Sequence, residues 1–206
     1  TGLALDALPP LDVVFISHSH YDHLDAASVR WLARHRAPRF VTCLGLGRWL
    51  ARRGATDVTE LDWWETMTIA GVTLTLTPSQ HWSNRAMFDL RRSLWGGCHL
   101  RHDDSPAVYF AGDSGYAPCF SQVAERLGPP QVALLPIGAY EPRWFMRDQH
   151  MNPADAVRAH QDLGATQSFA LHHAFFRLTE QGFDRPTPPL AAACADAGLT
   201  PDAFRV

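Results

Sequence analysis

Short apolar runs rich in β-branched residues alternate with amphipathic segments along the chain. These runs predict buried strands at residues 11–17, 39–43, 107–111, 132–137 and 168–171. Apolar residues at helical spacing predict helices over residues 26–35, 46–53, 120–127, 153–163 and 190–197. Strict alternation on both sides of Ala70-Gly71 predicts a β-hairpin at residues 66–78. The interleaving predicts an α/β protein or a closely related layered α+β arrangement.

Capping residues mark the ends of two of these helices. Asp25 is a typical N-cap for the first helix. Asn152-Pro153 places an N-cap and a proline at the start of the fourth helix, and Gly164 ends it.

The chain is long enough to form one sizeable core. It has 206 residues, of which 46% are hydrophobic and 19% charged, and no repeat or linker interrupts it. We therefore expect a single domain over residues 1–206. No window of about 18 apolar residues occurs, so no membrane-spanning helix is expected.

Charge and residue types exclude several classes of function. The formal net charge is -3 and the basic residues form no run, so we expect no nucleic-acid partner. All 18 basic residues are Arg, which excludes any mechanism that needs a catalytic lysine. The four cysteines form no C-x-x-C pair, and we expect reduced, mostly buried thiols.

Polar residues follow the predicted strands at the point where each strand ends. His18 follows the first strand and His81 follows the hairpin. Asp113 and His172 follow the strands at 107–111 and 168–171. Because the ends of neighbouring strands meet at one edge of a sheet, these four side chains are candidates for a common site.

The densest group of candidate ligands is the segment His18-Ser19-His20-Tyr21-Asp22-His23. His18 and His20 are two residues apart and point the same way in an extended segment. Asp22 and His23 follow as the chain turns into the next helix. Imidazole and carboxylate donors favour zinc, and iron or manganese suits the same donors. The spacing therefore predicts a metal site.

This segment resembles the H-x-H-x-D-H signature of the metallo-β-lactamase superfamily. The three later residues at strand ends stand in that family's ligand order. The resemblance implies two zinc ions per chain, held by seven residues: His18, His20 and His81 at one ion, Asp22, His23 and His172 at the other, and Asp113 bridging them. It also implies the family's αββα four-layer fold, an α+β sandwich. Because only 17 residues precede His18, we expect N-terminal strands of that fold to be absent from this chain.

Further motifs are similar to one branch of this superfamily, the N-acylphosphatidylethanolamine-hydrolysing phospholipases D. They are residues 17–25, His81-Trp82-Ser83-x-Arg85, Leu94-Trp95-Gly96-Gly97, 112–116, 136–146 and Gln149-His150. The block at 136–146 is the specific one, because the wider superfamily does not generally carry it. His173 departs from the aromatic residue expected beside the last ligand, which bears on the shape of the pocket.

The resemblance implies a zinc-dependent phosphodiesterase that releases N-acylethanolamine and phosphatidic acid from a membrane phospholipid. Two metal ions that share a bridging hydroxide would supply the nucleophile at neutral pH. Asp113 would hold both ions, and Asp22 would orient the hydroxide or accept its proton. His150 would contact the phosphate or the leaving group as an acid or hydrogen-bond donor. A role in capping the following helix is the alternative for His150.

The segment at 140–147 mixes aromatic side chains with arginine. Arg143 would hold a phosphate through paired hydrogen bonds. Beside Tyr140, the side chains Trp144, Phe145 and Met146 would contact acyl chains. Core packing or a homodimer contact is equally compatible with these aromatic residues.

Two other functions stay open. A different hydrolase on the same scaffold, such as a lactonase, would share the ligands and differ in the pocket. A fragment that binds metal or lipid without catalysis would keep the ligands and lack turnover. The expected partner is a phospholipid or a small phosphodiester or ester, with peripheral membrane contact. The expected location is the cytoplasm or a membrane surface, and the start at Thr1 gives no basis for predicting a targeting signal.

Overall fold

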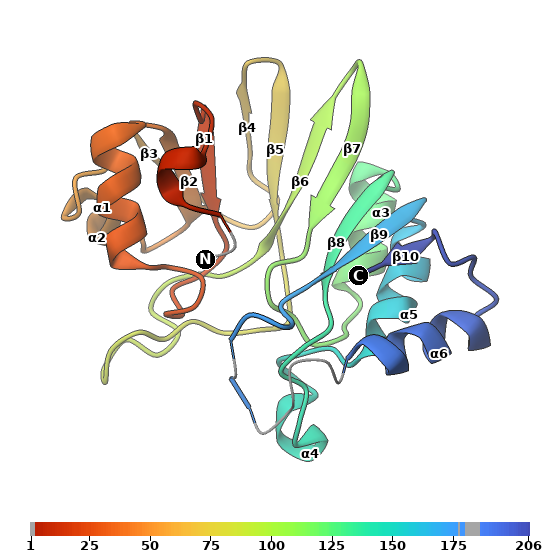
Figure 1. The fold of residues 1–206 in the computed structure, drawn as a ribbon. Coiled ribbons are helices and arrows are strands. Elements are labelled where there is room, and N and C mark those ends of the chain that lie inside the picture. Colours follow the sequence, from red (N-terminus) through yellow and green to blue (C-terminus); the bar gives the residue numbers. More distant parts are fainter. Residues whose placement is uncertain (1–2, 177, 180–185) are drawn as a thin grey trace. The chain divides into compact units, whose positions relative to one another are not determined.

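The computed structural model describes residues 3–176, 178–179 and 186–206. The chain divides into two compact units, each with its own sheet (Figure 1). Unit 1 comprises Thr1–Asp62 and Trp82–Trp95, and unit 2 comprises Trp63–His81 and Gly96–Val206. The division describes compact parts of the chain and does not test the expected domain boundaries, so a single domain over residues 1–206 stays a prediction.

Unit 1 is built on a three-stranded parallel sheet in the order β1-β2-β3. Its elements are η1 (Leu5–Ala7), β1 (Val13–Ile16), α1 (Ala26–His35), β2 (Arg39–Cys43), α2 (Gly47–Ala51) and β3 (Val58–Leu61). Asp25 caps α1 as predicted, because its Oδ2 accepts a hydrogen bond from the backbone N–H of Ser28 at 2.6 Å. Leu32 of α1, Phe40 of β2 and Leu50 of α2 share the core of this unit.

Unit 2 contains a seven-stranded sheet in the order β10-β9-β8-β7-β6-β5-β4. Its elements are β4 (Thr66–Ile69), β5 (Val72–Thr77), β6 (Gly97–His102), β7 (Ser105–Phe110), α3 (Cys119–Leu127), β8 (Val132–Pro136), α4 (Arg143–Met146), α5 (Pro153–Leu163), β9 (Gln167–Leu171), α6 (Thr187–Asp196) and β10 (Phe204–Arg205). Strands β4 to β7 pair antiparallel, and β7 to β10 pair parallel.

Helices α3, α5 and α6 pack along one face of this sheet (Figure 1). Tyr109 of β7 and Leu135 of β8 meet Phe120 of α3 and Val157 of α5 in a shared core. Parallel neighbours need a crossover connection, which α3 supplies between β7 and β8 and α5 supplies between β8 and β9. No helix in the described part of the chain is both long and apolar enough to cross a bilayer.

The strand directions place four carboxyl ends at one edge of the unit 2 sheet. Strands β5 and β7 are both antiparallel to β6 and therefore run the same way. Strands β8 and β9 are parallel to β7. The segments that leave β5, β7, β8 and β9 consequently start from a common edge, where α/β folds place their sites.

The predicted α/β class is confirmed, and each predicted strand and helix is present within a few residues. Strands β3, β6 and the two-residue strand β10 lie outside the strand ranges given above. Strand β3 has only four residues, and β6 carries His99, Arg101 and His102, so neither shows the apolar run typical of a buried strand.

The four cysteines are free and buried, as predicted. Burial raises the pKa of the Cys98 thiol to about 12 and that of the Cys119 thiol to about 11. Both thiols are therefore protonated at neutral pH and act as apolar core groups.

The core of unit 1 gives a direct test of this packing. Leu50 is fully buried, and Leu50→Ala should lower the free energy of unfolding by about 2–5 kcal/mol, because the lost contacts leave a cavity. Leu90→Ala, in the same unit at an exposed side chain, should change it by less than about 0.5 kcal/mol. Equal effects of the two substitutions in urea titrations would contradict this packing.

Candidate metal centre

Four predicted functional residues of unit 2 lie at the edge where strands β5, β7 and β9 end. His81 follows β5, Asp113 follows β7, His172 follows β9, and His150 precedes α5. Asp113 Oδ2 lies 3.3 Å from His172 Nε2 and 3.8 Å from His81 Nε2. The ring of His150 stacks on the ring of His172, with centroids 5.3 Å apart and planes 10° apart. It also meets the ring of His81 edge to face at 5.2 Å.

The donor set of this edge fits a divalent cation. Asp113 is 3% exposed, and positive charge or hydrogen-bond donors beside a carboxylate buried to this extent stabilise its ionised form. One ligand atom each from His81, Asp113 and His150 lie within 4.8 Å of one another. Imidazoles grouped around a carboxylate are the ligands that zinc and related transition metals prefer.

A backbone carbonyl fixes the ring of His81. His81 Nδ1 lies 3.0 Å from the carbonyl oxygen of Gln149. Because a carbonyl oxygen only accepts, Nδ1 carries the proton and Nε2 keeps its lone pair toward Asp113. Metal-binding histidines are typically oriented in this way by an acceptor at the second nitrogen.

The backbone around His172 adopts conformations that non-glycine residues rarely occupy. His172, Ala174 and Ala139 have φ values of +57°, +57° and +60°. Each costs about 1 kcal/mol, and such residues cluster at functional sites. Gly138 makes the closest approach, since a Cβ at this position would lie 2.0 Å from the carbonyl oxygen of His172.

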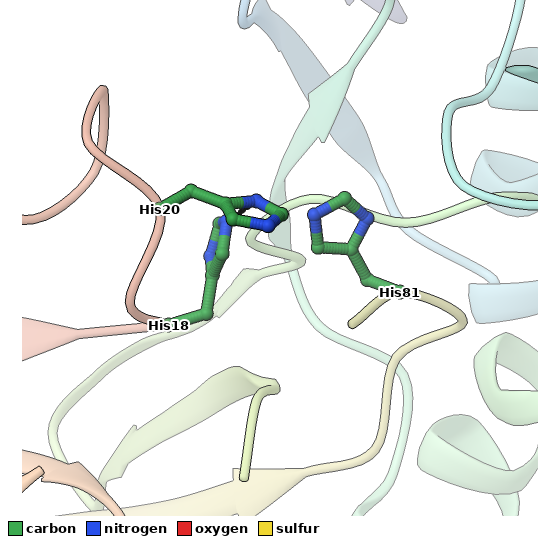
Figure 2. A group of neighbouring side chains, drawn as sticks. All are labelled: His18, His20 and His81. Carbon is green, nitrogen blue, oxygen red and sulfur yellow. Dashed lines mark hydrogen bonds between the residues drawn. The ribbon is translucent and has the colours of Figure 1, made fainter. Parts of the chain in front are cut away.

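The other predicted ligands form a cluster at the carboxyl end of β1 in unit 1. His18 is buried, and its Nδ1 lies 3.0 Å from Ser17 Oγ. His18 Nε2 lies 3.0 Å from His20 Nδ1, and the two rings meet edge to face (Figure 2). Asp22 Oδ2 lies 3.1 Å from His23 Nε2. Imidazole and carboxylate donors thus converge here as well.

Two residues outside the predicted set support the loop of unit 1. Arg85 Nη1 donates to the carbonyl oxygen of Ser19 at 3.1 Å, between His18 and His20 in sequence. Its guanidinium also lies 4.1 Å from the centroid of the Tyr21 ring. Trp82 meets the ring of His20 edge to face at 4.8 Å. The sequence signal for both was their place in the motif that follows His81.

The predicted substrate contacts surround the short helix α4. Tyr140 is buried, Met146 is partly buried, and Trp144 and Phe145 are 81% and 57% exposed. Arg143 donates from Nη1 to the carbonyl oxygen of His150 and pairs through Nη2 with the carboxylate of Asp155. Contact of these residues with a substrate stays a prediction.

Within each unit the structure brings the predicted ligands together. Unit 1 groups His18, His20, Asp22 and His23, and unit 2 groups His81, Asp113 and His172 with His150. The assignment of these ligands to two ions stays a prediction.

A family model described as a β-lactamase superfamily domain matches residues 2–173, which include every predicted ligand. The chain belongs to the metallo-β-lactamase superfamily. The resemblance to this superfamily is thereby confirmed. Its members include metal-dependent hydrolases, and the His and Asp groups of this chain are capable of binding metal.

Two curated relatives are named as phospholipases D that hydrolyse N-acylphosphatidylethanolamine. The mitochondrial protein of Saccharomyces cerevisiae is 33% identical over 189 residues, which cover 89% of this chain and 40% of that protein. The Caenorhabditis elegans relative, named as phospholipase D 1 of this kind, is 38% identical over 181 residues, which cover 82% of this chain and 51% of that protein. The chain thus spans about half the length of the curated relatives it matches.

A solved structure shows the same fold at lower identity. Igni18, a metallo hydrolase from Ignicoccus hospitalis, aligns with a TM-score of 0.71 at 24% identity. The alignment covers 95% of this chain and 75% of that protein. The metallo-β-lactamase fold implied by the ligand motifs is therefore confirmed.

The close approach at Gly138 predicts a specific defect in metal binding. Gly138→Ala should displace His172 and weaken zinc affinity by about 10–100-fold, measured by titration against a competing chelator. Gly128→Ala is the control, because Gly128 has a φ of +86° with no atom near its added Cβ. The control should lose about 1–3 kcal/mol of stability, because its backbone lies in a region that only glycine readily adopts, and should retain its zinc affinity. Wild-type zinc affinity in Gly138→Ala would contradict the close contact.

Proposed function

We propose that the chain is a metal-dependent phosphodiesterase acting on N-acylphosphatidylethanolamine-type phospholipids, releasing N-acylethanolamine and phosphatidic acid. The observation that carries this proposal is the buried Asp113 carboxylate between the imidazoles of His81 and His172. Similarity to two relatives that are named for this activity supports the choice of substrate.

The proposed centre holds two zinc ions through the donors of both clusters. The first ion would take His18, His20 and His81, the second would take Asp22, His23 and His172, and Asp113 would bridge them. The chain itself supports this grouping, because Trp82 directly follows His81 and contacts the ring of His20.

Side chains of this site account for both proton transfers of the reaction. Divalent ions held by these residues would polarise the phosphoryl group and make a water molecule nucleophilic at neutral pH. Asp22 accepts the proton that the water loses as its oxygen bonds to phosphorus. His150 donates a proton to the ethanolamine oxygen as the bond between that oxygen and phosphorus breaks. The stacked position of His150 on His172 supports its place beside the reacting groups.

Exposed aromatic residues support a substrate held in a lipid surface. Trp144 and Phe145 project from α4 with most of their surfaces open, and their rings lie 5.7 Å apart. Aromatic side chains of this kind favour the boundary between water and acyl chains. We therefore assign them to peripheral contact with the membrane that carries the substrate.

Turnover of defined substrates tests the proposal. The 206-residue chain should hydrolyse N-acylphosphatidylethanolamine in mixed micelles, and Asp113→Asn should lower kcat by more than about 100-fold, because the bridging carboxylate is lost. Asp202→Asn, at an exposed carboxylate, is the matched control and should keep wild-type activity. Turnover of a lactone without phospholipid hydrolysis would favour the lactonase alternative. Equal background rates in wild type and Asp113→Asn would favour a non-catalytic fragment.

Removal of the metal should destabilise the fold, because ligands from several segments bind the same ions. At zinc concentrations near 100 times Kd, a chelator should lower Tm by about 5–10 °C. Differential scanning calorimetry measures the shift, and Asp113→Asn should show a smaller one. An unchanged Tm in the wild-type chain would contradict a metal site linked to folding.

A further inference from the structure

Arg143 holds the backbone of His150 through a forked contact. Its Nη1 donates to the carbonyl oxygen of His150 at 2.8 Å. Its Nη2 pairs with the carboxylate of Asp155, whose side chain is 15% exposed. A planar guanidinium makes both contacts at once, whereas the single ammonium group of lysine does not reproduce this geometry.

Asp155 is itself fixed by the first turn of α5. Its backbone N–H donates to Asn152 Oδ1 at 2.8 Å, and Pro153 occupies the first helical position. The helix therefore positions the Asp155 carboxylate, and the carboxylate positions the guanidinium of Arg143. Support from a regular element makes a side-chain position more precise than support from a loop.

The neighbouring backbone of His150 is held in the same way. Its N–H donates to the carbonyl oxygen of Met146 at 2.9 Å, and the N–H of Met151 donates to the carbonyl oxygen of Ser114, also at 2.9 Å. Ser114 directly follows Asp113 in the chain. With these contacts in place, the ring of His150 lies between the rings of His81 and His172.

We propose that Arg143 is a positioning residue for His150. It holds the imidazole where it donates its proton to the departing ethanolamine oxygen, and this inference rests on the proposed function. The alternative is the predicted role of Arg143 in binding the phosphate directly. The two roles predict different effects of losing Arg143 on kcat and KM.

The leaving group separates these roles. Two phosphatidyl diesters serve as substrates, one releasing N-acylethanolamine and the other p-nitrophenolate, which departs as a stable anion without a proton. Arg143→Gln should lower kcat on the first about 10–100-fold and on the second less than about threefold, because only the first needs an acid. KM should stay within about twofold for both. Arg143→Lys should show the same pattern, and Asp155→Asn a weaker one.

A double-mutant cycle tests whether Arg143 acts through His150. Since both residues serve one step in this proposal, Arg143→Gln combined with His150→Ala should be within about twofold of His150→Ala alone on the ethanolamine substrate. Arg205→Gln, which removes an exposed ion pair with Asp202, is the control and should match the wild type. If Arg143→Gln unfolds at the assay temperature, Arg143→Lys and Asp155→Asn carry the same comparison.

Three results on an active wild-type chain would overturn the inference alone. Equal losses on both substrates would indicate a general structural effect, and a raised KM with multiplying losses in the double mutant would indicate direct phosphate binding. Wild-type rates in Arg143→Gln on both substrates would show that His150 needs no such support. If the wild-type chain hydrolyses neither diester, the proposed function itself fails, and the inference fails with it.

Discussion

The site depends on one constraint, which is that the carboxylate of Asp113 is buried among imidazoles. A negative charge in this position is stabilised by a cation beside it, and the imidazoles at this edge of the unit 2 sheet are suited to hold one. The strand order brings His81, Asp113 and His172 to the same edge from positions far apart in sequence. The left-handed backbone of His172 and the lack of a side chain at Gly138 are local consequences of this convergence.

Much of this arrangement is predictable from the sequence. The alternation of strands and helices predicts the class, and the polar residues at strand ends predict the candidate ligands, because parallel strands end at a common edge. The supporting contacts are not predictable in this way. The acceptors for His81 and Arg143 are backbone carbonyls of Gln149 and His150, and a carbonyl leaves no signal in residue type. Strand β6 is not predictable from the sequence for a different reason, which is that its polar side chains interrupt the apolar run typical of a buried strand.

The chain passes from unit 2 to unit 1 directly after His81. Residues 82–95 belong to unit 1, where Trp82 contacts His20 and Arg85 donates a hydrogen bond to the Ser19 carbonyl. Neighbouring residues of the short helix α4 have different surroundings. Arg143 supports the loop of His150, while Trp144 beside it is exposed. Helix α4 thus supports the candidate site through Arg143 and exposes an aromatic side chain through Trp144.

The central proposal is that the donors of both clusters hold a pair of divalent ions. X-ray diffraction from crystals of the zinc-loaded chain, recorded above and below the zinc absorption edge, tests it most directly. The account predicts two anomalous peaks per chain, both within bonding distance of Asp113 and each contacting its own group of histidines. A single peak away from Asp113, or peaks at surface side chains alone, would contradict it.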